Sequence, residues 1–151
     1  MNRSLVTVKP PRIALVLTVL AALATWLIPA QPKLLQAPVA VATTLAAAGF
    51  LIMMAGWRQF RNHEVLICPT EPTRLLITDG VYRFSRNPMY LGILMMLVGL
   101  ATGLGDLSFY IAAALFFLAM DRVFCPYEEK KLHRTFGRDY IDYRFRVRRW
   151  L

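Results

Sequence analysis

The pattern of apolar and polar positions divides the chain into four long hydrophobic blocks separated by shorter polar stretches. The blocks cover residues 13–29, 37–57, 89–105 and 107–124. A helix needs about 20 apolar residues to cross a membrane, and about 17 is the short limit. The second block meets this length, and the first and third meet it if their flanking Pro and Gly residues lie at the membrane interface. We therefore expect one all-α integral membrane domain with four transmembrane helices.

The residues from 126 to 151 form a polar tail that carries helix signals. Pro126 suits the first position of a new helix, acidic residues follow in its first turn, and Gly137 is expected to end it. Apolar residues then recur at intervals of four, three and four, at Phe136, Tyr140, Tyr143 and Val147. This spacing is typical of an amphipathic helix at a membrane interface, so we predict cytoplasmic or interfacial helices in the tail.

The distribution of basic residues predicts how the four helices are oriented. The chain has 57% hydrophobic residues, a mean hydropathy of +0.45 and a net charge of +9. Of its 18 Lys and Arg residues, all but Lys33 lie before the first block, between the second and third blocks, or after residue 121. With four spans these regions share one side, which the positive-inside rule makes the cytoplasm. We expect both termini to be cytoplasmic, in the bacterial inner membrane, with membrane lipids rather than nucleic acid as partners.

Two other interpretations of the apolar and cysteine residues are less consistent with this pattern. The first block could be a cleaved signal peptide with Arg3, Lys9 and Arg12 as its basic end. That interpretation leaves three spans and places either the middle loop or the tail on the wrong side. Cys68 and Cys125 fall on the cytoplasmic side, where thiols stay reduced, and no clustered histidines accompany them. We therefore expect neither a disulfide nor a metal site.

The connection between the second and third blocks is long for a compact protein. It covers residues 58–87 and contains Pro69, Pro72 and the turn dipeptide Asp79-Gly80. The apolar run 75–77 resembles a short strand. Connections of this length are usually functional or disordered, and the aromatic and apolar residues in this one favour an ordered loop.

Polar residues gather where the third and fourth blocks meet water. The third block opens with the segment Arg86-Asn87-Pro88-Met89-Tyr90-Leu91-Gly92, and the fourth is followed by Glu128 and Glu129. Ionisable groups close to a membrane-spanning segment are costly and often mark a functional site. The adjacent Asp121 and Arg122 should not face each other on a helix, so each is expected to need another partner.

Each of these residues also has a simpler structural interpretation. An acidic pair in a first helical turn stabilises that helix by about 0.3–1 kcal/mol. Arg86 and the residues after it would anchor the interface, and Tyr90 would belong to an aromatic belt. Gly99 and Gly103 have the spacing of closely packed helices. Gly92 either packs in the same way or lets a ligand approach the backbone.

Taken together, the two segments are more specific than either alone. From Thr78 to Val147 the chain resembles the isoprenylcysteine carboxyl methyltransferase and phospholipid methyltransferase superfamily, in which an Arg-His-Pro-x-Tyr-x-Gly segment and a downstream Glu-Glu pair form the S-adenosylmethionine site. The resemblance implies a set of cofactor-binding residues: Arg86, Asn87, Pro88, Tyr90, Gly92, Glu128 and Glu129. Asn87 replaces the family histidine, and its amide can donate and accept hydrogen bonds but cannot titrate near neutral pH. The candidate catalytic residues are Glu129, Arg122 and Arg134.

The residues and the resemblance predict S-adenosylmethionine-dependent methyl transfer to a lipophilic acceptor reached from the bilayer. An isoprenylcysteine carboxylate, an amino-lipid and a small thiol are all open as acceptors. One alternative is an NADPH-dependent reductase of the same superfamily. Another is a non-enzymatic four-span carrier or assembly protein. Four-span carriers are expected to hold a carboxylate in their first span, and this chain has none there.

Overall fold

The computed structural model describes residues 9–28, 30–62 and 75–151, which form helices and irregular connections. Along the chain the elements are α1 (Pro10–Leu27), α2 (Val39–Asn62), the short 3₁₀ helix η2 (Gly80–Arg83), α3 (Pro88–Leu104), α4 (Leu107–Ala119), the π-helical turn η3 (Met120–Phe124), α5 (Cys125–Phe136) and α6 (Arg138–Arg146). The only pairing of β type in these ranges is an isolated bridge between Lys33 and Asp106. The all-α prediction is confirmed for this part of the chain.

The strand-like interpretation of residues 75–77 is wrong. These residues are irregular, and no strand lies beside them within the described ranges to complete a ladder. Leu76 packs instead against the buried side chains of α6. The prediction of an ordered loop falls largely on residues 63–74, which lie outside the described residues together with Cys68.

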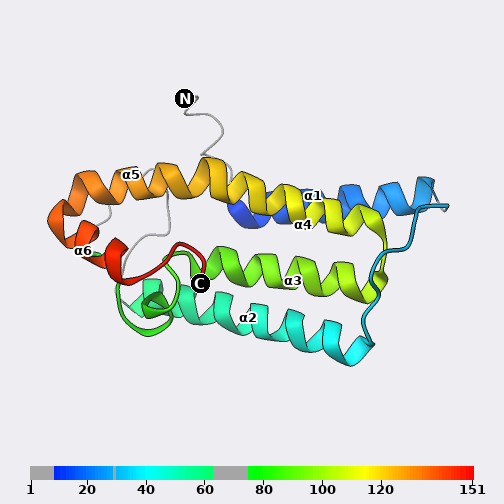
Figure 1. The fold of residues 1–151 in the computed structure, drawn as a ribbon, viewed down its shortest axis with the longest axis horizontal. Helices are drawn as coiled ribbons and strands as arrows, with labels where there is room; N and C mark the ends of the chain where they lie inside the picture. Colours follow the sequence, from blue (N-terminus) through cyan, green and yellow to red (C-terminus); the bar gives the residue numbers. More distant parts are fainter. Residues whose placement is uncertain (1–8, 29, 63–74) are drawn as a thin grey trace.

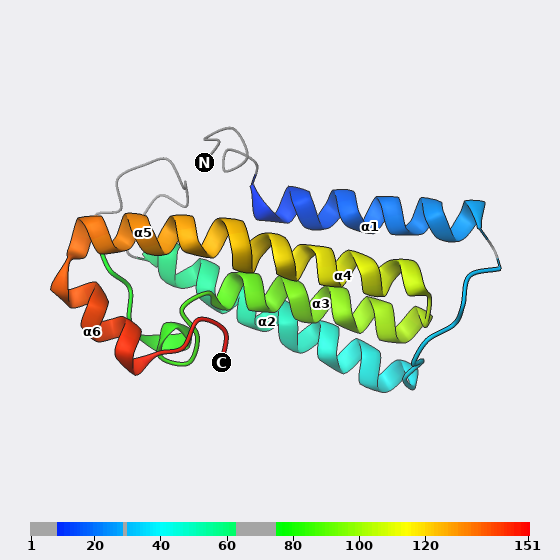
Figure 2. The ribbon, with the colours of Figure 1, turned by 45° about the horizontal axis from the view of Figure 1, so that its top comes forward.

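Successive long helices run in alternating directions and lie side by side. In Figures 1 and 2, α3 lies between α2 and α4, and α1 packs on the outer side of α4. Three helices are long and apolar enough to cross a membrane: α1, α2 and the continuous helix Leu107–Phe136. The fourth apolar helix, α3, has 17 residues. Large apolar side chains remain exposed on α1 and α4, among them Leu15, Leu20, Leu27, Ile111 and Leu118.

The fourth hydrophobic block does not end where the sequence predicted. Pro126 lies at the start of α5, as predicted, but α5 is not a separate helix, because one helix runs without a break from Leu107 to Phe136. A proline inside an α-helix lacks an N–H and clashes with the carbonyl four residues earlier. The wider π-helical turn η3 ends two residues before this proline and accommodates it. As a result, Glu128 and Glu129 stand on the same rigid element as Asp121.

Glycines bring α2 and α3 into close contact. A Cβ atom added to Gly92 would lie 2.4 Å from the carbonyl oxygen of Gly49, and one added to Gly99 would lie 2.8 Å from that of Ala42. An added Cβ on Gly103 would meet the Ala42 side chain at 3.1 Å. The packing role predicted for Gly99 and Gly103 is confirmed. Gly92 has the same role, since its backbone faces α2 rather than a ligand site.

Gly92→Ala is therefore expected to destabilise the protein by about 1–3 kcal/mol, the usual cost of overpacking a close contact. The added methyl group meets backbone, which cannot move aside as a flexible side chain can. Thermal unfolding in detergent would measure the loss. Gly103→Ala is the matched control and should cost less, since only the Ala42 side chain must shift. Equal melting temperatures for Gly92→Ala and wild type would contradict this account.

The tail folds back onto the protein after α5. Gly137 has a φ of 51° and ends α5, as predicted, because a residue without Cβ adopts this conformation easily. Tyr140, Tyr143 and Val147 are only 2%, 3% and 8% exposed and pack together with Leu76. The interfacial interpretation of this apolar stripe is therefore wrong. The stripe covers the protein itself and closes the end of the molecule where α3 begins (Figure 1).

Candidate functional site

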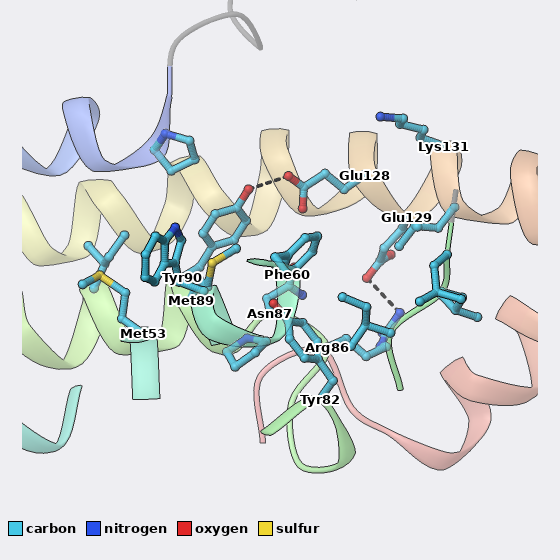
Figure 3. Close-up of a pocket in the computed structure, with 18 of the residues that line it drawn as sticks. Met53, Phe60, Tyr82, Arg86, Asn87, Met89, Tyr90, Glu128, Glu129 and Lys131 are labelled. Carbon is cyan, nitrogen blue, oxygen red and sulfur yellow. Dashed lines mark hydrogen bonds and ion pairs between the residues drawn. The ribbon is translucent and has the colours of Figure 1, made fainter. Parts of the chain in front are cut away.

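A cavity of about 600 Å³ lies where the start of α3 meets α2, α5 and α6. This volume is in the usual range for small-molecule sites. Six of the residues predicted for the cofactor site line it: Arg86, Asn87, Pro88, Tyr90, Glu128 and Glu129. Tyr90 and Glu128, 38 positions apart in the sequence, thus come together, because α5 passes over the N-terminal end of α3 (Figures 1 and 3).

Three predicted residues lie elsewhere. Gly92 packs against α2. The Arg122 side chain is 77% exposed, and its Nε lies 3.4 Å from Asp121. This contact contradicts the expectation that these neighbours do not meet, and the π-helical turn explains it, since successive side chains are rotated less there than in an α-helix. Arg134 is exposed on α5 and belongs to a separate small surface pocket.

Tyr90 and Glu128 connect the two helices across the cavity. The Tyr90 hydroxyl donates a hydrogen bond to the Glu128 carboxylate, as Figure 3 shows. Tyr90 lies in the first turn of α3, whose start is set by Pro88. Asn87 precedes this proline with a φ of −132° and remains outside the helix. Its side-chain amide donates to the Arg149 carbonyl oxygen at 3.2 Å.

Arg86 is a largely buried cation at the cavity. Its side chain is 10% exposed, its Nη1 lies 3.1 Å from Glu129, and the same nitrogen donates to the Tyr140 hydroxyl at 2.9 Å. Its Nε and the hydroxyl of Tyr82 are buried without a hydrogen-bond partner in the protein. Burial, together with Glu128, raises the pKa of Tyr82, so this phenol remains a neutral donor. Buried donors of this kind are costly unless a ligand or water satisfies them.

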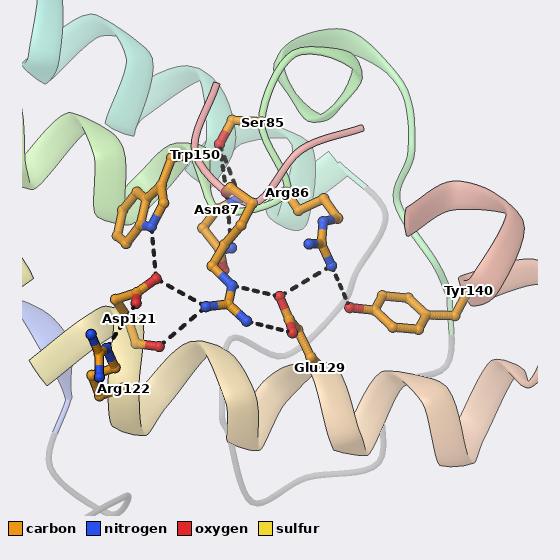
Figure 4. A network of polar contacts seen from close by, with 9 residues as sticks. Ser85, Arg86, Asn87, Asp121, Arg122, Glu129, Tyr140 and Trp150 are labelled. Atoms are coloured by element: carbon orange, nitrogen blue, oxygen red, sulfur yellow. Dashed lines mark hydrogen bonds and ion pairs between the residues drawn. The ribbon is translucent and has the colours of Figure 1, made fainter. Parts of the chain in front are cut away.

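A second cation, which the sequence analysis did not identify, completes the polar network in Figure 4. Arg149 donates to both oxygens of Glu129 at 2.8 Å and to the Asp121 carboxylate at 2.9 Å. The indole of Trp150 donates to the same carboxylate at 3.0 Å. These hydrogen bonds, to Glu129 first, raise the pKa of Arg149. The signal available in the sequence was the need of Asp121 for a partner other than its neighbour.

The opposite wall of the cavity is apolar. It is formed by side chains from the end of α2 and the start of α3: Met53, Met54, Trp57, Met89 and Ile93. In Figure 3 Met53 and Met89 lie toward one end of the cavity, and Arg86 and Glu129 lie toward the other. Such a cavity suits a ligand, or a pair of ligands, with a charged part and an apolar part.

Comparison with known proteins places the chain beside membrane methyltransferases. Residues 37–139 match the family model described as phospholipid methyltransferase. Protein-S-isoprenylcysteine O-methyltransferase B of Arabidopsis thaliana is 38% identical over 76 residues, which are 48% of this chain and 36% of that protein. A probable protein-S-isoprenylcysteine O-methyltransferase of Oryza sativa subsp. japonica is 40% identical over 81 residues, which are 51% of this chain and 40% of that protein.

The chain thus covers 36–40% of the length of these curated relatives. No solved structure gives a significant match. The apolar helices and the matched relatives together indicate an integral membrane protein.

Proposed function

The chain belongs to the phospholipid methyltransferase family, and on that premise we propose that it transfers a methyl group from S-adenosylmethionine to a lipophilic or membrane-partitioned acceptor. The observation that carries the proposal is the cavity between α3 and α5. It combines Arg86, Glu128 and two unpartnered buried donors with a wall of apolar residues from the membrane helices. A polar cofactor and a lipid-like acceptor require these two kinds of surface side by side.

The residues of the polar wall fit the groups of the cofactor. A guanidinium pairs well with a carboxylate, which assigns Arg86 to the amino-acid end, and its unpartnered Nε is a further donor there. Glu128 can accept from the ammonium or the ribose diol. The faces of Tyr82 and Tyr90 suit a cation or adenine. The Asn87 side chain donates one hydrogen bond to the Arg149 carbonyl oxygen, and its amide oxygen and second N–H can still bond to the same ligand.

When bound, S-adenosylmethionine would supply an electrophilic methyl group on a cationic sulfur. The contribution of this chain is to hold donor and acceptor in line and to exclude water, because methyl transfer is a displacement in which positioning provides much of the catalysis. Arg86, Asn87 and Glu128 would fix the polar end, while Met53 and Trp57 would border the acceptor. No proton transfer is assigned to Asn87, since an amide does not titrate near neutral pH.

The proposal includes four transmembrane helices, with α3 as the fourth. This helix is apolar throughout and lies between α2 and the helix that begins at Leu107, both of which are long enough to cross a membrane. A span of 17 residues is at the short limit. The regions rich in Lys and Arg would then face the cytoplasm, with both termini on that side.

Reporter fusions after Lys33 and after Leu151 test this topology. We expect them to report opposite sides of the membrane, because an odd number of helices separates the two positions if α3 crosses. A control fusion placed after Asn62 should report the same side as the fusion after Leu151 and the side opposite to the fusion after Lys33. The same side for Lys33 and Leu151 would contradict four spans.

Equilibrium binding to the detergent-purified protein distinguishes the proposed function from its alternatives. We expect labelled S-adenosylmethionine to bind and unlabelled S-adenosylhomocysteine to displace it, while NADPH does neither. Binding of NADPH alone would indicate a reductase. Binding of neither would indicate a carrier or an assembly protein.

The class of acceptor follows from whether the transferred methyl label is released by base. Protein and membrane lipids would be incubated with methyl-labelled S-adenosylmethionine and the lipid fraction treated with mild base. A carboxyl methyl ester releases volatile labelled methanol, whereas methyl groups on nitrogen or on a thioether sulfur stay with the lipid. Labelling with heat-denatured protein gives the background.

A further inference from the structure

We propose that Arg149 is a positioning residue, which holds Arg86 and Asn87 at the cavity through a latch made of Asp121, Glu129, Arg149 and Trp150. The proposal rests on the proposed function for its effect on the cofactor. The contacts of the latch itself do not depend on that function. Arg149 lies 62 residues after Asn87 in the sequence, and in the fold it joins the start of α3 to the helix that carries Glu128 and Glu129.

The guanidinium of Arg149 is engaged on two sides. Its Nε and Nη2 form a bidentate pair with Glu129, both at 2.8 Å. Its Nη1 donates to the carboxylate of Asp121 at 2.9 Å and to the Asp121 carbonyl oxygen at 3.3 Å. Only arginine has the planar fork that makes these contacts together. A lysine at this position would keep the charge but lose the fork.

The π-helical turn explains why this carbonyl is available. In the register of such a turn, a carbonyl accepts from the N–H five residues later, as Met120 does from Cys125. The corresponding partner of Asp121 would be Pro126, which has no N–H. The Arg149 side chain therefore donates to the Asp121 carbonyl in place of the missing N–H of Pro126, and this contact fixes the latch to the π-helical turn.

The backbone beside Arg149 holds the start of α3 directly. The N–H of Arg86 donates to the Arg148 carbonyl oxygen at 3.0 Å. The Ser85 hydroxyl and the Asn87 amide both donate to the Arg149 carbonyl oxygen, each at 3.2 Å. In Figure 4 Ser85, Arg86 and Asn87 lie across from the helix that carries Asp121 and Glu129. Each residue from 85 to 87 is thus tied to the segment 148–149.

Glu129 transmits the position of Arg149 to the cavity. One of its oxygens, Oε1, lies 2.8 Å from the Arg149 Nε and 3.1 Å from the Arg86 Nη1. Both arginines share this carboxylate, so Glu129 affects the cavity by positioning Arg86. Glu128 is the other carboxylate at the cavity, and it accepts the hydrogen bond of Tyr90. Without Arg149, Glu129 is free to rotate and Arg86 loses its fixed direction.

The test compares four full-length proteins in detergent: wild type, Arg149→Met, Arg149→Lys and Arg148→Met. Arg148→Met is the matched control, because this neighbouring side chain is exposed and only its backbone contacts Arg86. Hydrogen exchange of the peptide covering residues 84–88 reports the latch without any ligand. Calorimetry with S-adenosylhomocysteine measures the affinity of the cavity for this ligand.

We expect Arg149→Met to exchange residues 84–88 about tenfold faster and to bind S-adenosylhomocysteine about tenfold more weakly, because charged hydrogen bonds are lost. Arg149→Lys should recover the melting temperature more fully than the affinity, a split that a purely structural role would not produce. Arg148→Met should match wild type in exchange, affinity and melting temperature.

Unchanged exchange over residues 84–88 in Arg149→Met would overturn the latch, and unchanged affinity would overturn its positioning role. A wild-type protein that binds no S-adenosylhomocysteine would refute the proposed function, while the exchange comparison still decides the latch. If Arg149→Met does not fold, Trp150→Phe removes the indole donor to Asp121 and keeps an aromatic ring beside Phe117, and the same measurements apply with smaller expected changes.

Discussion

Arg86→Met is expected to weaken binding of S-adenosylhomocysteine by about ten- to a hundredfold. A charged hydrogen bond contributes about 1.5–3 kcal/mol, and each 1.4 kcal/mol changes an affinity tenfold. Arg86 is a largely buried cation at the cavity, and its buried Nε has no hydrogen-bond partner in the protein. Methionine has a similar length and no charge, so the substitution removes the interaction with a carboxylate while it fills most of the space.

Isothermal titration calorimetry of the detergent-purified variant measures this effect. Arg138→Met is the matched control, because Arg138 is exposed at the start of α6 and should bind like wild type. The variant should also remain folded, since Glu129 keeps its bidentate pair with Arg149. Wild-type affinity in a folded Arg86→Met protein would remove Arg86 from the proposed cofactor site.

Glu128→Gln is expected to lower the affinity for the cofactor by a similar amount. Comparing the losses for S-adenosylmethionine and S-adenosylhomocysteine shows which group of the cofactor the carboxylate faces. Glutamine keeps the shape and can still accept from the Tyr90 hydroxyl, but it has no charge. If Glu128 faces the sulfonium, S-adenosylmethionine loses more affinity than S-adenosylhomocysteine, whose sulfur is neutral. If it faces the ammonium or the diol, both ligands lose about 1.5–3 kcal/mol.

The comparison needs two further variants. Asp142→Asn removes an exposed carboxylate from α6 and should leave both affinities unchanged. Glu129→Gln should weaken binding through Arg86, and it should also speed exchange over residues 84–88, which Glu128→Gln should not. Unchanged affinity for both ligands in Glu128→Gln would return Glu128 to a structural role in its helix.

Neighbouring residues were sufficient to predict the helices and several residues of the site. Long apolar blocks make helices near a membrane, Pro88 sets the start of α3, and Gly105 and Gly137 end α3 and α5 with positive φ values. That Arg86, Tyr90 and Glu128 belong to one site was implied by the resemblance of two motifs to a known family, and the fold places all three at one cavity. The helices and their ends depend on residues that are close in the chain, so the sequence is enough to predict them.

Other features depended on which distant residues meet. The apolar stripe of Tyr140 and Tyr143 would fit lipid or protein equally well, because both environments exclude water, and only the fold assigned it to the protein interior. Pro126 was expected to begin a separate helix, because nothing local reveals that the preceding π-helical turn joins α5 to α4 without a break.

What the sequence by itself determined is therefore the all-α architecture, the apolar helices and the pairing of an Arg-Asn-Pro-x-Tyr segment with an acidic pair. Only the tertiary structure decided that Glu129 is shared between Arg86 and Arg149, while Glu128 bonds Tyr90. The physical reason is that a carboxylate pairs with whichever cation the fold brings within hydrogen-bond distance. For Glu129 one of these cations lies 20 residues further along the chain, beyond a turn and another helix.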